Sequence, residues 1–216
     1  MADLIKVGLT GGIATGKSTV AQRWHQNRAR VVAFIESDEL AHRCLEPGTA
    51  VWEKVVGYFG RQILRPDRSI DRRQLGEIVF ADEPKRLALN QMVHPAVRQL
   101  WTQALADLRN DGRTAAAVVA IPLLFETGAE KEFDVVVAVG CSEGTQQQRL
   151  MAKGMSEAQA GQRLRAQWPT QRKIDRADYV IWNDGRPELA HQQADIVWAA
   201  IEENHYAKTQ KQQTPT

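Results

Sequence analysis

Residues 8–19 read GLTGGIATGKST, and this stretch decides the fold. It continues the apolar run LIKV (4–7), which predicts a buried strand, and it leads into a segment with helical spacing of apolar residues. Residues 11–18, GGIATGKS, match the phosphate-loop pattern G-x-x-x-x-G-K-[ST]. Gly11 and Gly16 allow the backbone to turn so that its N–H groups point at phosphate oxygens. A strand, such a loop and a helix in this order predict nucleotide binding.

The side chains of the loop predict which part of the nucleotide it holds. We expect Lys17 to reach the β- and γ-phosphates of ATP and Ser18 to offer its hydroxyl to Mg²⁺. The helix that follows adds the positive end of its dipole. The alternative is a glycine-rich turn with an incidental lysine. The predicted nucleotide-binding residues are Gly12, Ile13, Ala14, Thr15, Gly16, Lys17, Ser18 and Thr19.

Composition places the chain among ordinary globular proteins. It has 216 residues, of which 43% are hydrophobic and 25% charged, and a net charge of +2. Bulk charge therefore implies no nucleic-acid partner. The longest apolar run, residues 115–125, is too short to span a bilayer and contains Pro122, and the N-terminus lacks the apolar core of a signal peptide. We expect a cytoplasmic protein without a membrane partner, with Cys44 and Cys141 as reduced thiols.

Apolar runs and helical spacings alternate along the chain. This alternation predicts an α/β fold with a parallel five-stranded sheet flanked by helices. The expected strands cover residues 4–10, 30–35, 116–121, 134–140 and 177–182. The expected helices cover 17–28, 37–45, 49–59, 142–152, 156–167 and 187–204, together with most of 71–110.

Local signals refine the helix ends. Ser37 or Asp38 is expected to cap the helix that follows the second strand, and Asp71 with Gln74 forms a capping-box pattern. Pro84 and Pro95 each suit the first turn of a helix. The tail from His205 lacks apolar periodicity and is expected to be disordered.

A phosphate loop does not name a reaction. A GTPase would need an N-K-x-D tetrapeptide to read the base, and the sequence contains none. A motor would usually carry an acid at the end of the third strand, where Ala120 stands. A small kinase needs only the loop, Mg²⁺, a base for the acceptor hydroxyl and a mobile cationic lid.

The order of motifs resembles the dephospho-coenzyme A kinase family. The motifs are TGGIATGKST, SDELAH, EPGT, DRRQLGEIVF, HPAVR, PLLFE, QRLMAKGMS, RLRAQWP and ADYVIWNDG, colinear from residue 5 to about 200. The resemblance implies a nucleoside-monophosphate-kinase-like fold. It also implies Mg²⁺-dependent transfer of the γ-phosphoryl group of ATP to the ribose 3′-hydroxyl of dephospho-coenzyme A, the last step of coenzyme A synthesis. A nucleoside or nucleoside monophosphate kinase and a non-catalytic nucleotide-binding regulator remain alternatives.

The resemblance also implies a domain plan. A single P-loop kinase domain covers residues 1–204, with a core of about 1–36, 113–152 and 177–204. A helical acceptor-side insertion takes up about 37–112, a lid takes up about 149–168, and 205–216 form the tail.

The family's acceptor-side residues match positions in this chain. Asp38 matches the catalytic base and an Mg²⁺ contact, although Glu36 stands where the family has a further Asp; by its position alone, Asp38 could equally cap a helix. Arg72 and His94 match positions near the acceptor. The acceptor-site motif matches Pro122, Leu123, Leu124, Phe125 and Glu126, which from the residues alone could be a turn at the edge of the core.

The nucleotide-side matches lie later in the chain. Arg149, Lys153 and Arg163 are cations of the expected lid, and Arg149 and Arg163 are predicted to act on the reacting phosphate; a solvated helix face is the alternative. The lid is one residue shorter than the usual pattern, with Lys153-Gly154 in place of Arg-Asp-Gly. Asn183 matches a residue near the adenine, although Trp182 replaces the usual Asp, and a simple turn at the strand end is the alternative.

Overall fold

The computed structural model describes residues 4–26 and 32–213, and the chain divides into two compact units. Unit 1 comprises Met1–Ile35 and Leu108–Thr216, and unit 2 comprises Glu36–Asp107. Each unit has an apolar core of its own.

Unit 1 is built on a five-stranded sheet in the order β2-β3-β1-β4-β5. β1 pairs in parallel with β3 and β4, and β4 pairs in parallel with β5. The three central strands, β1, β3 and β4, are rich in Val and Ala and are buried on both faces, as expected for a sheet covered by helices. The prediction of an α/β fold with a parallel sheet is therefore confirmed. The strands are β1 (Ile5–Thr10), β2 (Val32–Glu36), β3 (Ala116–Ala120), β4 (Val135–Gly140) and β5 (Tyr179–Trp182).

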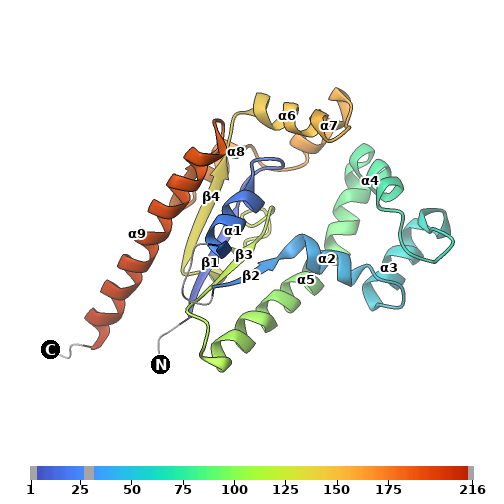
Figure 1. The fold of residues 1–216 in the computed structure, drawn as a ribbon. Coiled ribbons are helices and arrows are strands. Elements are labelled where there is room, and N and C mark those ends of the chain that lie inside the picture. The colour runs from blue at the N-terminus through green and yellow to red at the C-terminus, as the bar shows by residue number, and fades with distance from the viewer. Residues whose placement is uncertain (1–3, 27–31, 214–216) are drawn as a thin grey trace. The chain divides into compact units, whose positions relative to one another are not determined.

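Two helices cover one face of this sheet, α1 (Lys17–Gln26) and α9 (Pro187–Gln213), as Figure 1 shows. The rings of Trp24 in α1 and Trp198 in α9 lie 5.1 Å apart, and Trp24 Nε1 donates to the carbonyl of Ala194 at 2.8 Å. Both rings are fully buried, so this pair fastens the two helices to each other above the strands.

The second face of the sheet is approached closely at two glycines. A Cβ atom at Gly8 of β1 would come within 2.8 Å of Leu124, in the loop after β3. A Cβ atom at Gly140 of β4 would come within 2.7 Å of Ile174 in α8 (Thr170–Ile174). The loop after β3, which continues into the short helix η2 (Ala129–Glu132), and α8 therefore both cover this second face.

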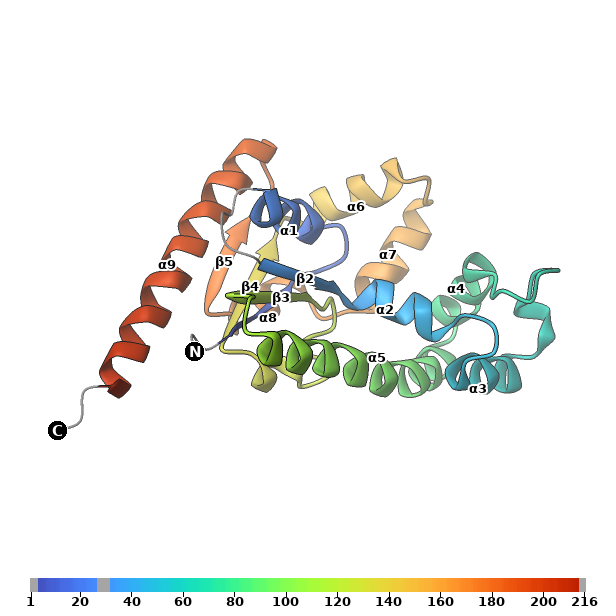
Figure 2. The same cartoon turned by 60° about the horizontal axis from the view of Figure 1, so that its bottom comes forward.

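Two helices follow β4 and are joined by a tight turn, α6 (Glu143–Ala152) and α7 (Glu157–Arg165), as can be followed in Figure 2. Ser142 caps α6, and Ser156 forms a complete capping box with Gln159 at the start of α7. Both helices were predicted from the sequence. Helix α8 was not, because five residues are too short for apolar periodicity to show.

Unit 2 is mainly helical. Its core is formed by the buried side chains of Trp52, Val55, Phe59, Ile63, Ile70, Leu75 and Val79. Asp71 caps α4 by accepting from the N–H groups of Arg73 and Gln74, as its pattern predicts. The helices are α2 (Ser37–Cys44), α3 (Ala50–Phe59), η1 (Arg61–Ile63), α4 (Arg72–Ala81) and α5 (Glu83–Asp111), whose last residues continue into unit 1.

Three local expectations are wrong. The N-cap of α2 is Glu36, whose side chain makes no capping hydrogen bond, and neither Ser37 nor Asp38 takes that place. Pro84 lies in the first turn of α5 but Pro95 lies inside this helix, because the buried face continues on both sides of it at Val93 and Val97.

The third concerns the tail. Helix α9 runs on to Gln213, so the expected disorder from His205 is not found up to that residue. Residues 205–213 include several Lys and Gln and no Gly or Pro, so intrinsic propensity favours extending the helix without an apolar face. The expected end of the helix at 17–28 and the expected start of the strand at 30–35 fall within residues 27–31. These residues and residues 214–216 lie outside the described part of the chain.

Candidate active site

The phosphate loop lies between β1 and α1, where the sequence predicts it. Gly11 has φ = +147° and Gly16 has φ = +98°, backbone conformations that side chains with a Cβ rarely adopt. Ala14 has φ = +59°, a left-handed conformation that is unusual for a residue other than glycine. The loop therefore depends on its glycines for its shape, as a loop that wraps a phosphate does.

Three side chains from other elements hold the carbonyl oxygens of this loop. Gln146 Nε2 in α6 donates to the carbonyl of Ile13 at 2.6 Å. Arg149 Nη1 in α6 donates to the carbonyls of Ala14 and Thr15 at 3.1 and 3.3 Å. Asn183, just after β5, donates from Nδ2 to the carbonyl of Thr15 at 2.8 Å. The loop is therefore fixed by its carbonyls, which favours a shape that exists before a ligand binds.

Lys17 and Ser18 open helix α1. Lys17 Nζ donates to the carbonyls of Gly11 and Gly12 at 3.1 and 3.0 Å, so the ammonium lies against the first turn of the loop. Ser18 is exposed in the first turn of the helix. The site thus offers a set of hydrogen-bond donors that suits a nucleoside triphosphate: the amides of the glycine loop, the Lys17 ammonium, the N-terminus of α1 and the Ser18 hydroxyl.

The same residues fit Mg²⁺ that arrives with the nucleotide. Mg²⁺ is usually held by one or two protein oxygens together with phosphate oxygens and water, and Ser18 offers such an oxygen. Within the described part of the chain, no group of three His, Cys, Asp or Glu could hold a metal ion by itself. Ser18 would therefore hold the ion, and the nucleotide would have to supply the other oxygens.

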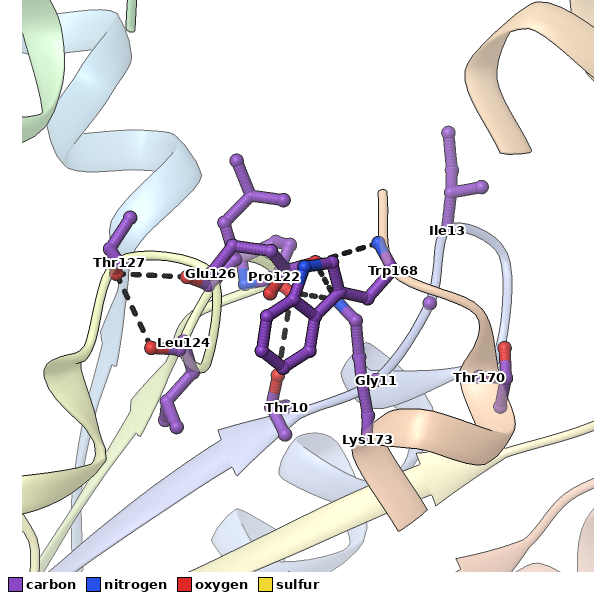
Figure 3. Close-up of polar contacts among 12 residues, drawn as sticks. Thr10, Gly11, Ile13, Pro122, Leu124, Glu126, Thr127, Trp168, Thr170 and Lys173 are labelled. Carbon is purple, nitrogen blue, oxygen red and sulfur yellow. Dashed lines mark hydrogen bonds and ion pairs between the residues drawn. The ribbon is translucent and has the colours of Figure 1, made fainter. Parts of the chain in front are cut away.

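The predicted acceptor loop, Pro122–Glu126, lies directly after β3 and is held by one buried lysine (Figure 3). Lys173 Nζ in α8 lies 2.8 Å from Glu126 Oε1 and donates to the carbonyl of Pro122 at 2.5 Å. The backbone N–H of Trp168 donates to the same Glu126 oxygen at 2.9 Å. Leu124 and Phe125 of this loop are buried.

Sequence reasoning did not find Lys173. Its side chain is 0% exposed, and burial lowers the pKa of its ammonium, although the hydrogen bond and charge of Glu126 act in the opposite direction. In the sequence it stands beside Arg172 and near Arg176, which are exposed, so nothing marked it as different. Only the fold shows which of these cations is buried.

The expected lid cations are placed differently from one another. Arg149 turns its guanidinium toward the phosphate loop and also donates to the carbonyl of Asn183 at 2.8 Å. Lys153 is exposed at the end of α6. Arg163 is half-buried in α7, and burial lowers the pKa of its guanidinium. Arg149 therefore supports the phosphate loop, whereas Lys153 and Arg163 lie farther along the helical hairpin formed by α6 and α7.

Asn183, the residue predicted near the adenine, is buried against the loop. Its own N–H donates to the carbonyl of Gly140 at 2.7 Å, which ties the end of β5 to the end of β4. The next residue, Asp184, accepts from the N–H and the hydroxyl of Ser142 at 3.0 and 2.9 Å. This junction fixes the start of α6 and therefore the position of Gln146 and Arg149.

Three predicted site residues belong to unit 2. Asp38 is exposed in the first turn of α2, and Arg72 is exposed at the start of α4. His94 is half-buried in α5, and burial lowers the pKa of its imidazole. Their roles toward the acceptor remain predictions from the motifs.

Comparison with known proteins identifies the family. The model of the family described as dephospho-CoA kinase matches residues 5–188. The dephospho-CoA kinase of Geobacter sulfurreducens is 43% identical over 194 residues, which cover 89% of this chain and 96% of that protein. That of Bacillus cereus is 39% identical over 194 residues, covering 89% and 95%.

Solved structures agree with this. The dephospho-CoA kinase from Campylobacter jejuni superposes with a TM-score of 0.64 at 27% identity, over 92% of this chain and 98% of that one. A shikimate kinase from Acinetobacter baumannii, at 17% identity, superposes with a TM-score of 0.55 over 94% and 96% of the two chains and shares the fold alone. The chain belongs to the dephospho-CoA kinase family.

Proposed function

We propose that this chain is a dephospho-coenzyme A kinase, which transfers the γ-phosphoryl group of ATP to the ribose 3′-hydroxyl of dephospho-coenzyme A and releases ADP and coenzyme A. The observation that carries the proposal is the match to the dephospho-CoA kinase family over residues 5–188, which includes the phosphate loop and the loop after β3. We also infer a cytoplasmic location, because the proposed reaction consumes ATP. Within the described residues, no helix is both long and apolar enough to cross a bilayer.

At the nucleotide side, the loop would bind the phosphates through its amides and Lys17. The carbonyls of Ile13, Ala14 and Thr15 are already engaged by side chains, so little reorganisation is needed when ATP binds. The ammonium of Lys17 neutralises charge that grows on the phosphates in the transition state, and it exchanges its present carbonyl partners for phosphate oxygens. Ser18 would hold Mg²⁺ that arrives with the nucleotide, and the ion would supply further neutralisation of charge.

At the acceptor side, Asp38 would accept the proton of the 3′-hydroxyl as the general base. Its exposed position in the first turn of α2 and its lack of a capping role leave its carboxylate available for this task. Arg72 and His94 would contact the acceptor from the same unit. Residues Pro122–Glu126 match the family's acceptor-site motif and are likewise proposed to bind the acceptor.

The helical hairpin α6–α7 would carry the cations that close over the phosphates. Arg163 is half-buried in α7, and loss of hydration favours a strong contact with a phosphate anion. Lys153 would add a second, more mobile charge. Arg149 would act on the phosphates through the loop that it supports.

An acceptor screen tests the proposal. The purified chain is incubated with ATP and Mg²⁺, and ADP release is followed with dephospho-coenzyme A, with nucleoside monophosphates and with no acceptor. Turnover with dephospho-coenzyme A alone supports the proposed function. Turnover with a nucleoside monophosphate instead would show a different kinase, and ATP binding without turnover would indicate a regulator.

A further inference from the structure

Lys173 is a buried cation that the predicted chemistry does not use. Its side chain is 0% exposed, and Glu126, at 15%, is nearly as deep. A charged group is rarely buried at this depth unless it has a specific partner, because desolvation disfavours the charged form. Here the ammonium has two oxygen partners in the loop after β3, the carboxylate of Glu126 and the carbonyl of Pro122.

Helix α8 carries this lysine and contacts both substrate-binding loops of unit 1. Lys173 holds the loop after β3, while Thr170 at the other end of α8 donates from Oγ1 to Gln146 Oε1 at 3.1 Å. Gln146 in turn holds the phosphate loop at Ile13. A Cβ atom at Gly12 would come within 2.7 Å of Thr170 Oγ1, so the loop and the helix are in close contact (Figure 3).

Glu126 has one oxygen engaged and one without a partner. Oε1 accepts from Lys173 and from the N–H of Trp168 at 2.8 and 2.9 Å. Oε2 is buried and has no hydrogen-bond partner among the described residues. A buried carboxylate oxygen is normally satisfied by a donor, so this carboxylate depends for its position on the partners of Oε1, Lys173 and the N–H of Trp168.

We propose that Lys173 is a positioning residue for the acceptor: it fixes Glu126 through Oε1 and Pro122 through its carbonyl, and so holds the loop after β3 in the shape that binds dephospho-coenzyme A. The proposal rests on the proposed function, because the acceptor is the one named there. Lys173 acts through the loop and does not touch the substrate. Its loss therefore affects binding of the acceptor more than binding of ATP.

The first test is the substitution Lys173→Met, which keeps the length of the side chain and removes the charge. We expect the KM for dephospho-coenzyme A to rise about 10-fold or more, the scale of a lost charged hydrogen bond, while the KM for ATP changes less than about twofold. Lys131→Met removes an exposed lysine from η2 and serves as the matched control, with both KM values unchanged. An unchanged acceptor KM in Lys173→Met would overturn the proposal.

A second variant separates positioning from folding. Lys173→Met leaves the Glu126 carboxylate buried without a counter-ion, so it also destabilises the fold, whereas Lys173→Met with Glu126→Gln removes both charges. We expect the urea midpoint of the double variant to return toward the wild-type value while its acceptor KM stays raised. Recovery of the acceptor KM together with stability would show that Lys173 is only a counter-ion and would overturn the proposal. If the single variant does not fold, the double variant compared with Glu126→Gln carries the test.

The wild-type chain is measured first with dephospho-coenzyme A. Absence of turnover in that measurement refutes the proposed function, and the positioning role with it. Wild-type turnover with an unchanged acceptor KM in the variants refutes the positioning role alone.

Discussion

Arg149 donates from Nη2 to the backbone carbonyl of Asn183 at 2.8 Å, and both side chains also hold the carbonyl of Thr15 in the phosphate loop. One carbonyl of the loop is thus fixed from α6 and from the end of β5 at the same time. Both residues had been predicted to touch the nucleotide directly. Their contacts give them a further role, which is to hold the loop that binds it.

Arg149→Ala tests this role. The substitution removes hydrogen bonds to three carbonyls, and a charged hydrogen bond contributes about 1.5–3 kcal/mol. We expect kcat to fall and the KM for ATP to rise, with kcat/KM for ATP lower by about 10- to 100-fold. Arg149→Lys should recover only part of this, because a single ammonium nitrogen cannot take the positions of both Nη1 and Nη2. Arg186→Ala, at an exposed site after β5, is the control, and wild-type ATP kinetics in Arg149→Ala would refute the role.

Asp38→Asn tests the catalytic base. The structure gives Asp38 no capping role in α2, so the isosteric change should leave the helix intact. We expect kcat to fall by at least ~10², the usual scale for loss of a general base, with little change in either KM. Circular dichroism of the same preparation verifies the fold. Unchanged turnover would exclude Asp38 as the base and leave the acceptor hydroxyl to be activated by another group.

Arg163→Ala tests the lid. A cation that meets the phosphates only when the hairpin closes contributes mainly to the transition state, so kcat and kcat/KM should fall together. Lys153→Ala should show a smaller loss, because its exposed, flexible side chain holds its charge less firmly. Steady-state kinetics at saturating ATP and dephospho-coenzyme A measure both. If Arg163→Ala keeps the wild-type kcat, α7 does not act as a catalytic lid.

The sequence predicted the elements of the fold well where apolar patterns are long. The Val-rich runs at residues 116–121 and 134–140 became β3 and β4, and the loop at residues 11–18 took the expected place between β1 and α1. The short helix α8 was missed because five residues leave no periodicity to read. The length of α9 was underestimated because helix propensity, without an apolar face, extends it past His205.

Site residues were predictable only where a motif names them. Lys17 belongs to a local pattern whose geometry follows from the chain around it. Lys173 has no such pattern, since its partners Pro122 and Glu126 lie about fifty residues earlier and the fold alone brings them together. The support of the phosphate loop by Gln146 and Asn183 has the same origin in long-range contacts.

The lowered pKa of the Asp184 carboxyl predicts that the stability of the fold depends on pH. The side chain of Thr145, and then the backbone N–H of Ser142, hold the pKa of the Asp184 carboxyl below its usual range. A carboxyl whose pKa is lowered in the folded state stabilises that state above the unfolded pKa, and the contribution is lost as the pH falls through the folded pKa. The melting temperature of Asp184→Asn should therefore be lower than that of the wild type near neutral pH, and the two should converge in acid. A difference that is constant from pH 3 to pH 7 would contradict this.

The proposed reaction is phosphoryl transfer from ATP to the 3′-hydroxyl of dephospho-coenzyme A at the glycine loop. The most direct measurement is identification of the product by mass spectrometry and phosphorus NMR, after incubation of the purified chain with ATP, Mg²⁺ and dephospho-coenzyme A, with Lys17→Ala in parallel. We predict that the wild type phosphorylates dephospho-coenzyme A at the 3′ position and so forms coenzyme A. Lys17→Ala should fold normally but form coenzyme A at least ~10² more slowly, because the charge of Lys17 stabilises the transition state. No coenzyme A from the wild type, or a near-normal rate from Lys17→Ala, would contradict the account.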